Sequence, residues 1–234
     1  MKRQLQFVHV GKCGGSTILE LLSQSPVVSE KYSSFYESHV NGVKITSDCD
    51  YLICLRNPID RAFSAFEWRK KLVLEDKLPD QVRRFPGERK VLRQYQSLGA
   101  MARSLYRSDG RINQAVARDF NCVHHLRESI SFYCRPLLDV LTPFNVLGAV
   151  CQETLAIDCT RLLDVDASGL RERSNESKRR IDQDLDVEAV NNLKRFLVED
   201  YQCITALWSL GALTDQQFWR VMKSSVGKGV ASEL

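Results

Sequence analysis

Long hydrophobic runs are missing from this 234-residue sequence, and neither sign of charge dominates it. The apolar stretch after the basic residues near the N-terminus is too short for a signal peptide or a membrane span. The net charge of +4 at neutral pH is too small to indicate nucleic-acid binding by itself. These absences predict a cytoplasmic protein without stable membrane insertion and without a nucleic-acid partner.

Cysteine pairs with metal-ligand or redox spacing are also missing. None of the cysteines forms a C-x-x-C pair, and several lie in apolar runs such as Tyr51–Leu55. Buried free thiols in a reducing compartment fit this pattern better than a disulfide framework. No spacing of cysteine and histidine indicates a metal site, so no metal is expected. The eight cysteines are Cys13, Cys49, Cys54, Cys122, Cys134, Cys151, Cys159 and Cys203.

Short apolar runs and helical periodicity divide the sequence into strands and helices. The predicted strands are Leu5–Val10, Tyr51–Leu55 and Phe144–Val150. The predicted helices are Ser16–Leu22, Ile59–Leu72, Cys151–Leu163, Asp186–Leu210 and Thr214–Met222. Residues 88–140 are predicted to be helical with interruptions at Asp109-Gly110 and Pro136. Residues 78–90 are predicted to be a loop or a broken helix, and residues 164–184 a loop. This alternation predicts an α/β fold with a small central parallel sheet flanked by helices and a helix-rich C-terminal half.

A glycine-rich loop joins the first predicted strand to the first predicted helix. Glycines let backbone N–H groups turn toward an anion, and the helix N-terminus adds the positive end of a dipole. Lys12 supplies a mobile cation, and Ser16 and Thr17 supply hydroxyl donors. Because Lys12 precedes the glycine pair, this is not a standard ATPase loop, and a plain strand-to-helix turn is the other interpretation. The loop reads Gly11-Lys12-Cys13-Gly14-Gly15-Ser16-Thr17.

A second motif begins where the second predicted strand ends. Arg56 stands at the carboxyl end of this buried strand, where α/β sheets bind their ligands. Ser64 follows about two helical turns later. The two side chains could share one phosphate, with the arginine binding through its planar fork of donors.

Together the two motifs resemble those of sulfotransferases that use 3′-phosphoadenosine 5′-phosphosulfate (PAPS). The resemblance is closest to the carbohydrate branch that includes the heparan sulfate 2-O-sulfotransferases. Its first loop, similar to H-V-P-K-T-G-G-T-S, is matched by His9–Thr17, with Gly11 and Cys13 in place of the usual Pro and Thr. Its second motif, R-(D/N)-P-x-(D/E)-R-x-x-S, is matched by Arg56–Ser64. The resemblance implies a P-loop-like three-layer fold in a single sulfotransferase-like domain over residues 1–234, with cofactor loops at 9–17 and 56–64.

The resemblance also implies a reaction. A sulfuryl group passes in line from PAPS to an acceptor hydroxyl, leaving 3′-phosphoadenosine 5′-phosphate (PAP) without the help of a metal. Lys12 is expected to stabilise the leaving phosphate, while the other residues of the first loop hold the 5′-phosphate. Arg56 and Ser64 are expected to hold the 3′-phosphate. In the wider superfamily a basic loop closes over that phosphate, a role that one of Lys178, Arg179 and Arg180 is expected to take here, with Lys178 as the candidate. A solvated run of charge is the other interpretation of these three residues.

The acceptor hydroxyl needs a base, and His39 is the first candidate. It lies between the two cofactor motifs in an H-V setting similar to that of the 2-O-sulfotransferase branch, and imidazole is a competent base at neutral pH. Glu37 is the alternative, because other sulfotransferase branches use a carboxylate. His9 is expected to pack or to orient the loop. His124 and His125 are expected on a helix, where neighbouring side chains point about 100° apart and do not enter one site together.

Positive charge gathers along one stretch. From Arg61 to Arg111 there are 13 Lys and Arg against 6 Asp and Glu, which is typical either of an anionic partner or of a solvated helical surface. Residues 69–140 are therefore expected to form an acceptor-specific helical region, with an anionic glycan as the favoured acceptor. Two other functions stay open, a P-loop-type small-molecule kinase and a non-catalytic nucleotide-binding module. The kinase would need an acidic strand end for Mg²⁺, where this chain has Arg56.

Overall fold

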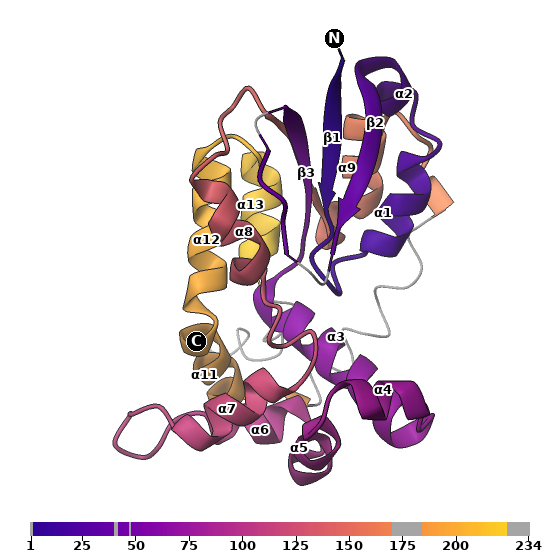
Figure 1. Ribbon diagram of the computed structural model, residues 1–234. Helices are drawn as coiled ribbons and strands as arrows, with labels where there is room; N and C mark the ends of the chain where they lie inside the picture. Colours follow the sequence, from indigo (N-terminus) through magenta and orange to yellow (C-terminus); the bar gives the residue numbers. More distant parts are fainter. Residues whose placement is uncertain (1, 40–41, 47, 170–183, 224–234) are drawn as a thin grey trace. The chain divides into compact units, whose positions relative to one another are not determined.

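The computed structural model describes residues 2–39, 42–46, 48–169 and 184–223 (Figure 1). Contacts group the chain into two compact units, which are described separately. The sheet unit comprises Met1–Asn57, Glu128–Arg173 and Glu199–Lys223, and the helical unit comprises Pro58–Arg127, Ser174–Val198 and Ser224–Leu234. The single sulfotransferase-like domain over 1–234 stays a prediction.

The sheet unit is built on four parallel strands in the order β2-β1-β3-β4. The strands are β1 (Arg3–Val8), β2 (Tyr32–Ser38), β3 (Cys49–Leu55) and β4 (Val146–Cys151). Residues 51–55 of β3 are all buried, as expected of an apolar strand that is covered on both faces. The predicted α/β class with a small parallel sheet is confirmed, and the P-loop-like assignment stays a prediction.

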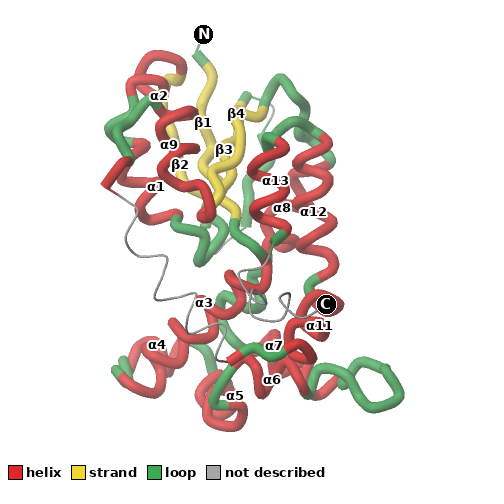
Figure 2. The backbone as a smooth tube through the Cα atoms, turned by 180° about the vertical axis from the view of Figure 1, so that it is seen from behind, coloured by secondary structure: helices red, strands yellow, loops and turns green. Residues whose placement is uncertain are grey.

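Helices pack beside this sheet in two groups, which Figures 1 and 2 show from opposite directions. One group contains α1 (Gly15–Leu22), α2 (Pro26–Lys31) and α9 (Leu155–Leu163). The other contains α8 (Ile130–Leu138), α12 (Val198–Ser209) and α13 (Asp215–Met222). A short 3-10 turn, η2 (Gln152–Thr154), links β4 to α9. Apolar side chains from both groups and from the strands form one core.

The helical unit has only helices and turns in its described part, apart from an isolated bridge between Tyr106 and Ile112. Its buried apolar residues include Phe63 and Phe66 of the first helix. None of the helices in the described ranges of either unit has the length and apolar character needed to cross a membrane. The elements of the helical unit are α3 (Pro58–Lys70), the π-helical η1 (Lys71–Glu75), α4 (Pro79–Arg84), α5 (Glu88–Tyr95), α6 (Leu98–Arg103), α7 (Gln114–Cys122) and α11 (Val187–Phe196).

Several predicted elements were wrong. The sequence YSSFYES forms the edge strand β2, which was not among the predicted strands because it is rich in polar residues and lacks a run of apolar ones. The helix predicted over Asp186–Leu210 is interrupted at Leu197, where φ is −93° and ψ is 21°. Pro136 does not interrupt α8, because it lies in the last turn and costs one backbone hydrogen bond. Over residues 78–90 the broken helix is confirmed and the loop is wrong, because α4 ends at Arg84 and α5 begins at Glu88.

Candidate functional site

The glycine-rich loop leaves β1 and ends at the first residue of α1. Gly14 is the N-cap of this helix and has a φ of 82°, in the left-handed region that favours glycine. A Cβ on Gly14 would lie 2.2 Å from Oε1 of Gln152, and a Cβ on Gly15 would lie 2.0 Å from Cδ2 of His9. The positive φ favours glycine at position 14, and the close approach of the His9 ring favours glycine at position 15. Lys12 also has a positive φ, of 70°.

The start of α1 can accept an anion. Within the described part of the chain no side chain caps this helix. The N–H groups of Thr17 and Ile18 already bond to the carbonyl of Gly14, at 3.1 and 3.2 Å, and the first N–H groups of the helix precede them. Uncapped N–H groups at a helix start favour negative charge. This geometry fits a phosphate group of the cofactor expected from the sequence.

Arg56 joins this loop from the neighbouring strand. It follows β3 directly, and its Nη1 donates to the carbonyl oxygen of Lys12 at 3.3 Å. The contact arises because β1 and β3 are adjacent and parallel, so their carboxyl ends lie at the same edge of the sheet. Lys12 and Arg56 are both partly exposed. The Arg56 guanidinium thus lies at the loop that carries Lys12, and a site for a highly charged anion needs such donors.

Cys13 contributes to the loop in a different way. Its side chain is completely buried in the core of the sheet unit, and its Sγ is 3.9 Å from the carbonyl oxygen of Gly11. It also contacts Cys54, whose thiol pKa is raised well above the ordinary value, first by burial and then by the hydrogen bond with Cys13. Only the backbone N–H of Cys13 is thus placed to contact a ligand.

Residues after β4 complete the same edge of the sheet, and they were not predicted. The carboxylate of Glu153 accepts a hydrogen bond from the backbone N–H of Asn57 at 2.7 Å. The side-chain amide of Asn57 donates to the carbonyl of Val221 at 2.7 Å, and Gln152 lies against Gly14 as described above. One signal in the sequence could have found Gln152 and Glu153: they directly follow β4, and the carboxyl ends of parallel strands are where ligands bind.

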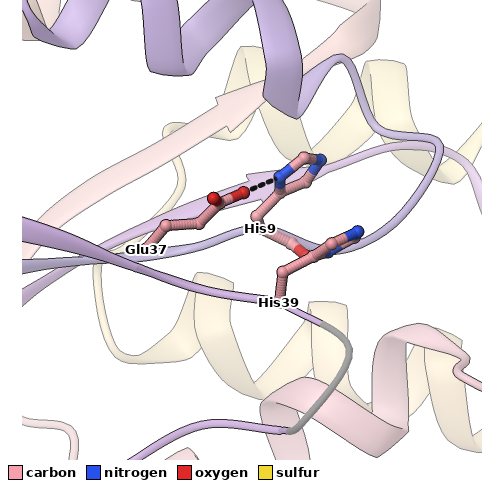
Figure 3. Close-up of side chains that lie close together, drawn as sticks. All are labelled: His9, Glu37 and His39. Atoms are coloured by element: carbon pink, nitrogen blue, oxygen red, sulfur yellow. Dashed lines mark hydrogen bonds and ion pairs between the residues drawn. The ribbon is translucent and has the colours of Figure 1, made fainter.

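His9, Glu37 and His39 form a polar cluster, the His9 cluster, at this edge (Figure 3). His9 directly follows β1, Glu37 lies near the end of β2 and His39 directly follows β2. Nδ1 of His9 donates to the carboxylate of Glu37, and Nδ1 of His39 donates to the carbonyl oxygen of His9 at 2.8 Å. The two imidazole rings are stacked, with centroids 4.1 Å apart and 20° between their planes. His39 also stacks on Tyr133 of α8, at 6.5 Å.

The electrostatics of this cluster favour a neutral His9. Burial lowers the pKa of His9 below its ordinary value of 6.5, and the nearby His39 and Lys12 act in the same direction. The hydrogen bond to Glu37 and the negative charge of Glu37 raise the pKa of His9, but by less than the other effects lower it. His39 is partly exposed, whereas His9 is 8% exposed.

The same cluster offers three side-chain atoms that could bind a metal, one from each residue, within 4.8 Å of one another. Imidazole lone pairs lie in the plane of the ring, so two rings that share one metal must point toward a common position about 2 Å from each nitrogen. Stacked rings that are nearly parallel do not converge in this way. The observed arrangement suits a hydrogen-bonded unit and does not fit a metal without rotation of a ring.

The remaining predicted residues are Ser64, Lys178, His124 and His125. Ser64 is partly buried in α3 of the helical unit, and its pairing with Arg56 stays a prediction. Lys178 lies outside the described residues. The helix expected at His124 and His125 is wrong, because both follow the end of α7 in a turn where His125 has a φ of 67°. Their rings are stacked at 4.0 Å, so the two side chains do lie together.

Comparison with known proteins gave no match: no family model, no curated protein and no solved structure matches the chain. The resemblance to sulfotransferases therefore depends on the two sequence motifs, and the family assignment stays a prediction.

Proposed function

We propose that this protein is a PAPS-dependent sulfotransferase that modifies an acceptor hydroxyl. The observation that carries the proposal is the contact between Arg56 and Lys12 at a glycine-capped helix start. It places the guanidinium of Arg56 beside the backbone N–H donors of the loop, at the carboxyl edge of a parallel sheet. PAPS carries phosphate at both the 5′ and the 3′ position, so its recognition needs more than one anion-binding group.

Each residue then has a defined task. When bound, PAPS supplies the sulfuryl group and a phosphate leaving group. The backbone N–H groups of Gly14, Gly15 and Ser16 and the hydroxyls of Ser16 and Thr17 bind the 5′-phosphate, and Lys12 stabilises the negative charge that develops on the leaving oxygen. Arg56, with Ser64, binds the 3′-phosphate. These roles are positional and electrostatic, as in phosphoryl transfer.

His39 is the proposed base. Its Nδ1 donates to the carbonyl of His9, so the lone pair of the neutral ring is on Nε2. That nitrogen takes the proton of the acceptor hydroxyl as the sulfuryl group is transferred. Glu37 is a weaker candidate, because its carboxylate is already bonded to His9.

The acceptor is proposed to be a carbohydrate with negative charge. Three exposed basic residues, Arg89, Lys90 and Arg93, lie on α5 at a spacing that places Arg93 next to both of the others. Charge of one sign on an exposed helix steers an anionic partner toward the protein, in a manner that salt weakens. Activity on a polyanionic glycan should therefore fall with salt more steeply than activity on an uncharged sugar.

Calorimetric titration with PAP and with ADP in EDTA tests the proposal most directly. Tight binding of PAP and weak binding of ADP are expected, because only PAP has a 3′-phosphate for Arg56. Arg56→Ala should weaken PAP binding by about tenfold or more, which corresponds to about 1.4 kcal/mol. The matched control is Arg135→Ala, which removes an exposed arginine that pairs with Glu199 in the same unit.

The opposite results are equally informative. Equal affinity for PAP and ADP would refute the PAPS site. A requirement for Mg²⁺ with preference for ATP would favour the small-molecule kinase. Selective PAP binding without transfer to any acceptor would favour the non-catalytic nucleotide-binding module.

A further inference from the structure

The side chain of His9 contacts three parts of the candidate site at once. Its Nδ1 bonds to the carboxylate of Glu37, and the face of its ring stacks on His39. Its Cδ2–Nε2 edge lies against Gly15, where a Cβ would be 2.0 Å from Cδ2 and 2.1 Å from Nε2. One ring therefore connects the acid, the proposed base and the first residue of α1.

This arrangement makes His9 a poor base itself. Gly15 covers its Nε2, and the residue is only 8% exposed. His39 is the more exposed of the two histidines. Its ring is restrained in two directions, within its plane by the hydrogen bond to the carbonyl of His9 and across its plane by the stacked ring.

We propose that His9 and Glu37 are positioning residues for His39, an inference that rests on the proposed function. Glu37 fixes the ring of His9, and the ring of His9 fixes the orientation of His39. Because the same ring packs on Gly15, the base and the phosphate-binding loop share one rigid frame. A base that is displaced by an ångström loses much of its catalytic effect. The frame therefore affects the rate of sulfuryl transfer more than it affects the affinity for the ligand.

A double-mutant cycle tests this chain of contacts. Glu37 is exposed, so Glu37→Ala should fold. It should lower kcat about tenfold, with the dissociation constant of PAP changed less than about twofold. In a His39→Gln background the same change should lower kcat less than about twofold, since Glu37 acts only through His39. Additive losses would overturn the proposal, as expected if His9 were the base and Glu37 its partner.

Rescue separates orientation from charge. Glu37→Gln keeps an oxygen that accepts from Nδ1 of His9 but loses the negative charge. Most of the wild-type kcat should return in this variant. A Gln variant as slow as the Ala variant would overturn the positioning role, because charge would then be the essential property. Glu30→Gln, an exposed acid of α2 in the same unit, is the matched control and should leave kcat unchanged.

A measurement without turnover separates this inference from the proposed function. Nitrogen NMR of the imidazoles should show His39 as one tautomer with the proton on Nδ1 in the wild type. Glu37→Ala should give a mixture of tautomers at His39, and an unchanged spectrum would overturn the inference. If the wild type transferred no sulfuryl group but showed this dependence on Glu37, the proposed function would fail while the positioning of His39 stood.

Discussion

The four histidines form two stacked pairs, one in each unit, and the carboxylates near the two pairs have different partners. In the sheet unit, the carboxylate of Glu37 bonds to the ring of His9 itself. In the helical unit, the rings of His124 and His125 are stacked and Phe85 lies against His124 at 4.0 Å. There the carboxylate of Glu88 accepts a hydrogen bond from the backbone N–H of His124.

The carboxylate beside the second histidine pair, that of Glu88, forms an ion pair with a buried arginine. Arg69 donates to both oxygens of Glu88, at 2.8 and 2.6 Å, and each side chain is 1% exposed. The side chains of His9 and Glu37 are 10% and 32% exposed. A fully buried ion pair contributes to the stability of the fold and cannot contact a ligand. A partly exposed cluster beside a phosphate-binding loop can contact a ligand. We call the second group, Arg69, Glu88, His124 and His125, the Arg69 cluster.

The largest effect is expected from breaking the Arg69 cluster. Arg69→Ala leaves the charge of Glu88 buried without its partner, so the free energy of unfolding should fall by about 3–5 kcal/mol. Urea unfolding measures this loss. Arg83→Ala, which removes an exposed pair with Asp80 in the same unit, should change the unfolding midpoint little.

Replacement of both buried partners tests the same point from the other side. The double variant Arg69→Met with Glu88→Leu should recover a large part of the stability that Arg69→Ala loses, because no buried charge remains. A double variant no more stable than Arg69→Ala would contradict this account.

The next effect is expected at the loop beside the His9 cluster. Lys12→Ala should lower kcat on the order of 10³-fold with a modest loss of PAP affinity, because the charge it stabilises is greatest in the transition state. Steady-state kinetics with PAPS, together with PAP calorimetry, measures both quantities. Lys31→Ala, an exposed lysine of α2, is the control. Wild-type turnover in the Lys12→Ala variant would show that the loop has no role in the reaction.

A smaller loss of activity is expected at the proposed base. His39→Ala should lower kcat at neutral pH on the order of 10²-fold and leave PAP affinity nearly unchanged. The free energy of unfolding should change far less than it does for Arg69→Ala, because His39 is partly exposed. Unchanged turnover would exclude His39 as the base. A loss of stability as large as that of Arg69→Ala would contradict the distinction between a His9 cluster that acts on a ligand and an Arg69 cluster that stabilises the fold.

The smallest effect concerns acid sensitivity. The pKa of His9 is lower in the folded protein than its ordinary value of 6.5, so the folded state binds fewer protons than the unfolded state in this range. The stabilising contribution is complete above about pH 6.5 and is lost as the pH falls toward the folded pKa. His9→Phe should flatten the decline of unfolding free energy below pH 6.5. An identical decline in both proteins would show that His9 does not titrate in this way.

The candidate loop could be predicted because its chemistry is local. A lysine and a glycine pair between an apolar strand and a helix need no tertiary information, and Arg56 follows from the rule that parallel strands end at one edge. The positive φ of Gly14 and the close approach of His9 to Gly15 agree with the glycines in the sequence. Strand β3 was recognisable for a similar reason, since it is apolar throughout.

The rest depended on long-range contacts. β2 shows no apolar alternation because it pairs on one side only, so its strand character comes from β1. The bond between Glu37 and His9 joins residues that are distant in the sequence and meet through that pairing. The stacking of His124 on His125 needs the left-handed backbone of His125, which no local pattern reveals.

The sheet unit is assembled from three separated stretches of the chain, and this order affects its synthesis. Gln217 donates to the carbonyl of Ala149 at 2.7 Å, and Asn57 to that of Val221 at the same distance. At cellular rates of translation, roughly ten seconds or more separate the appearance of β3 from that of α13. During that time the sheet unit lacks the cover that α13 supplies, and incompletely covered apolar surface favours aggregation of a nascent chain.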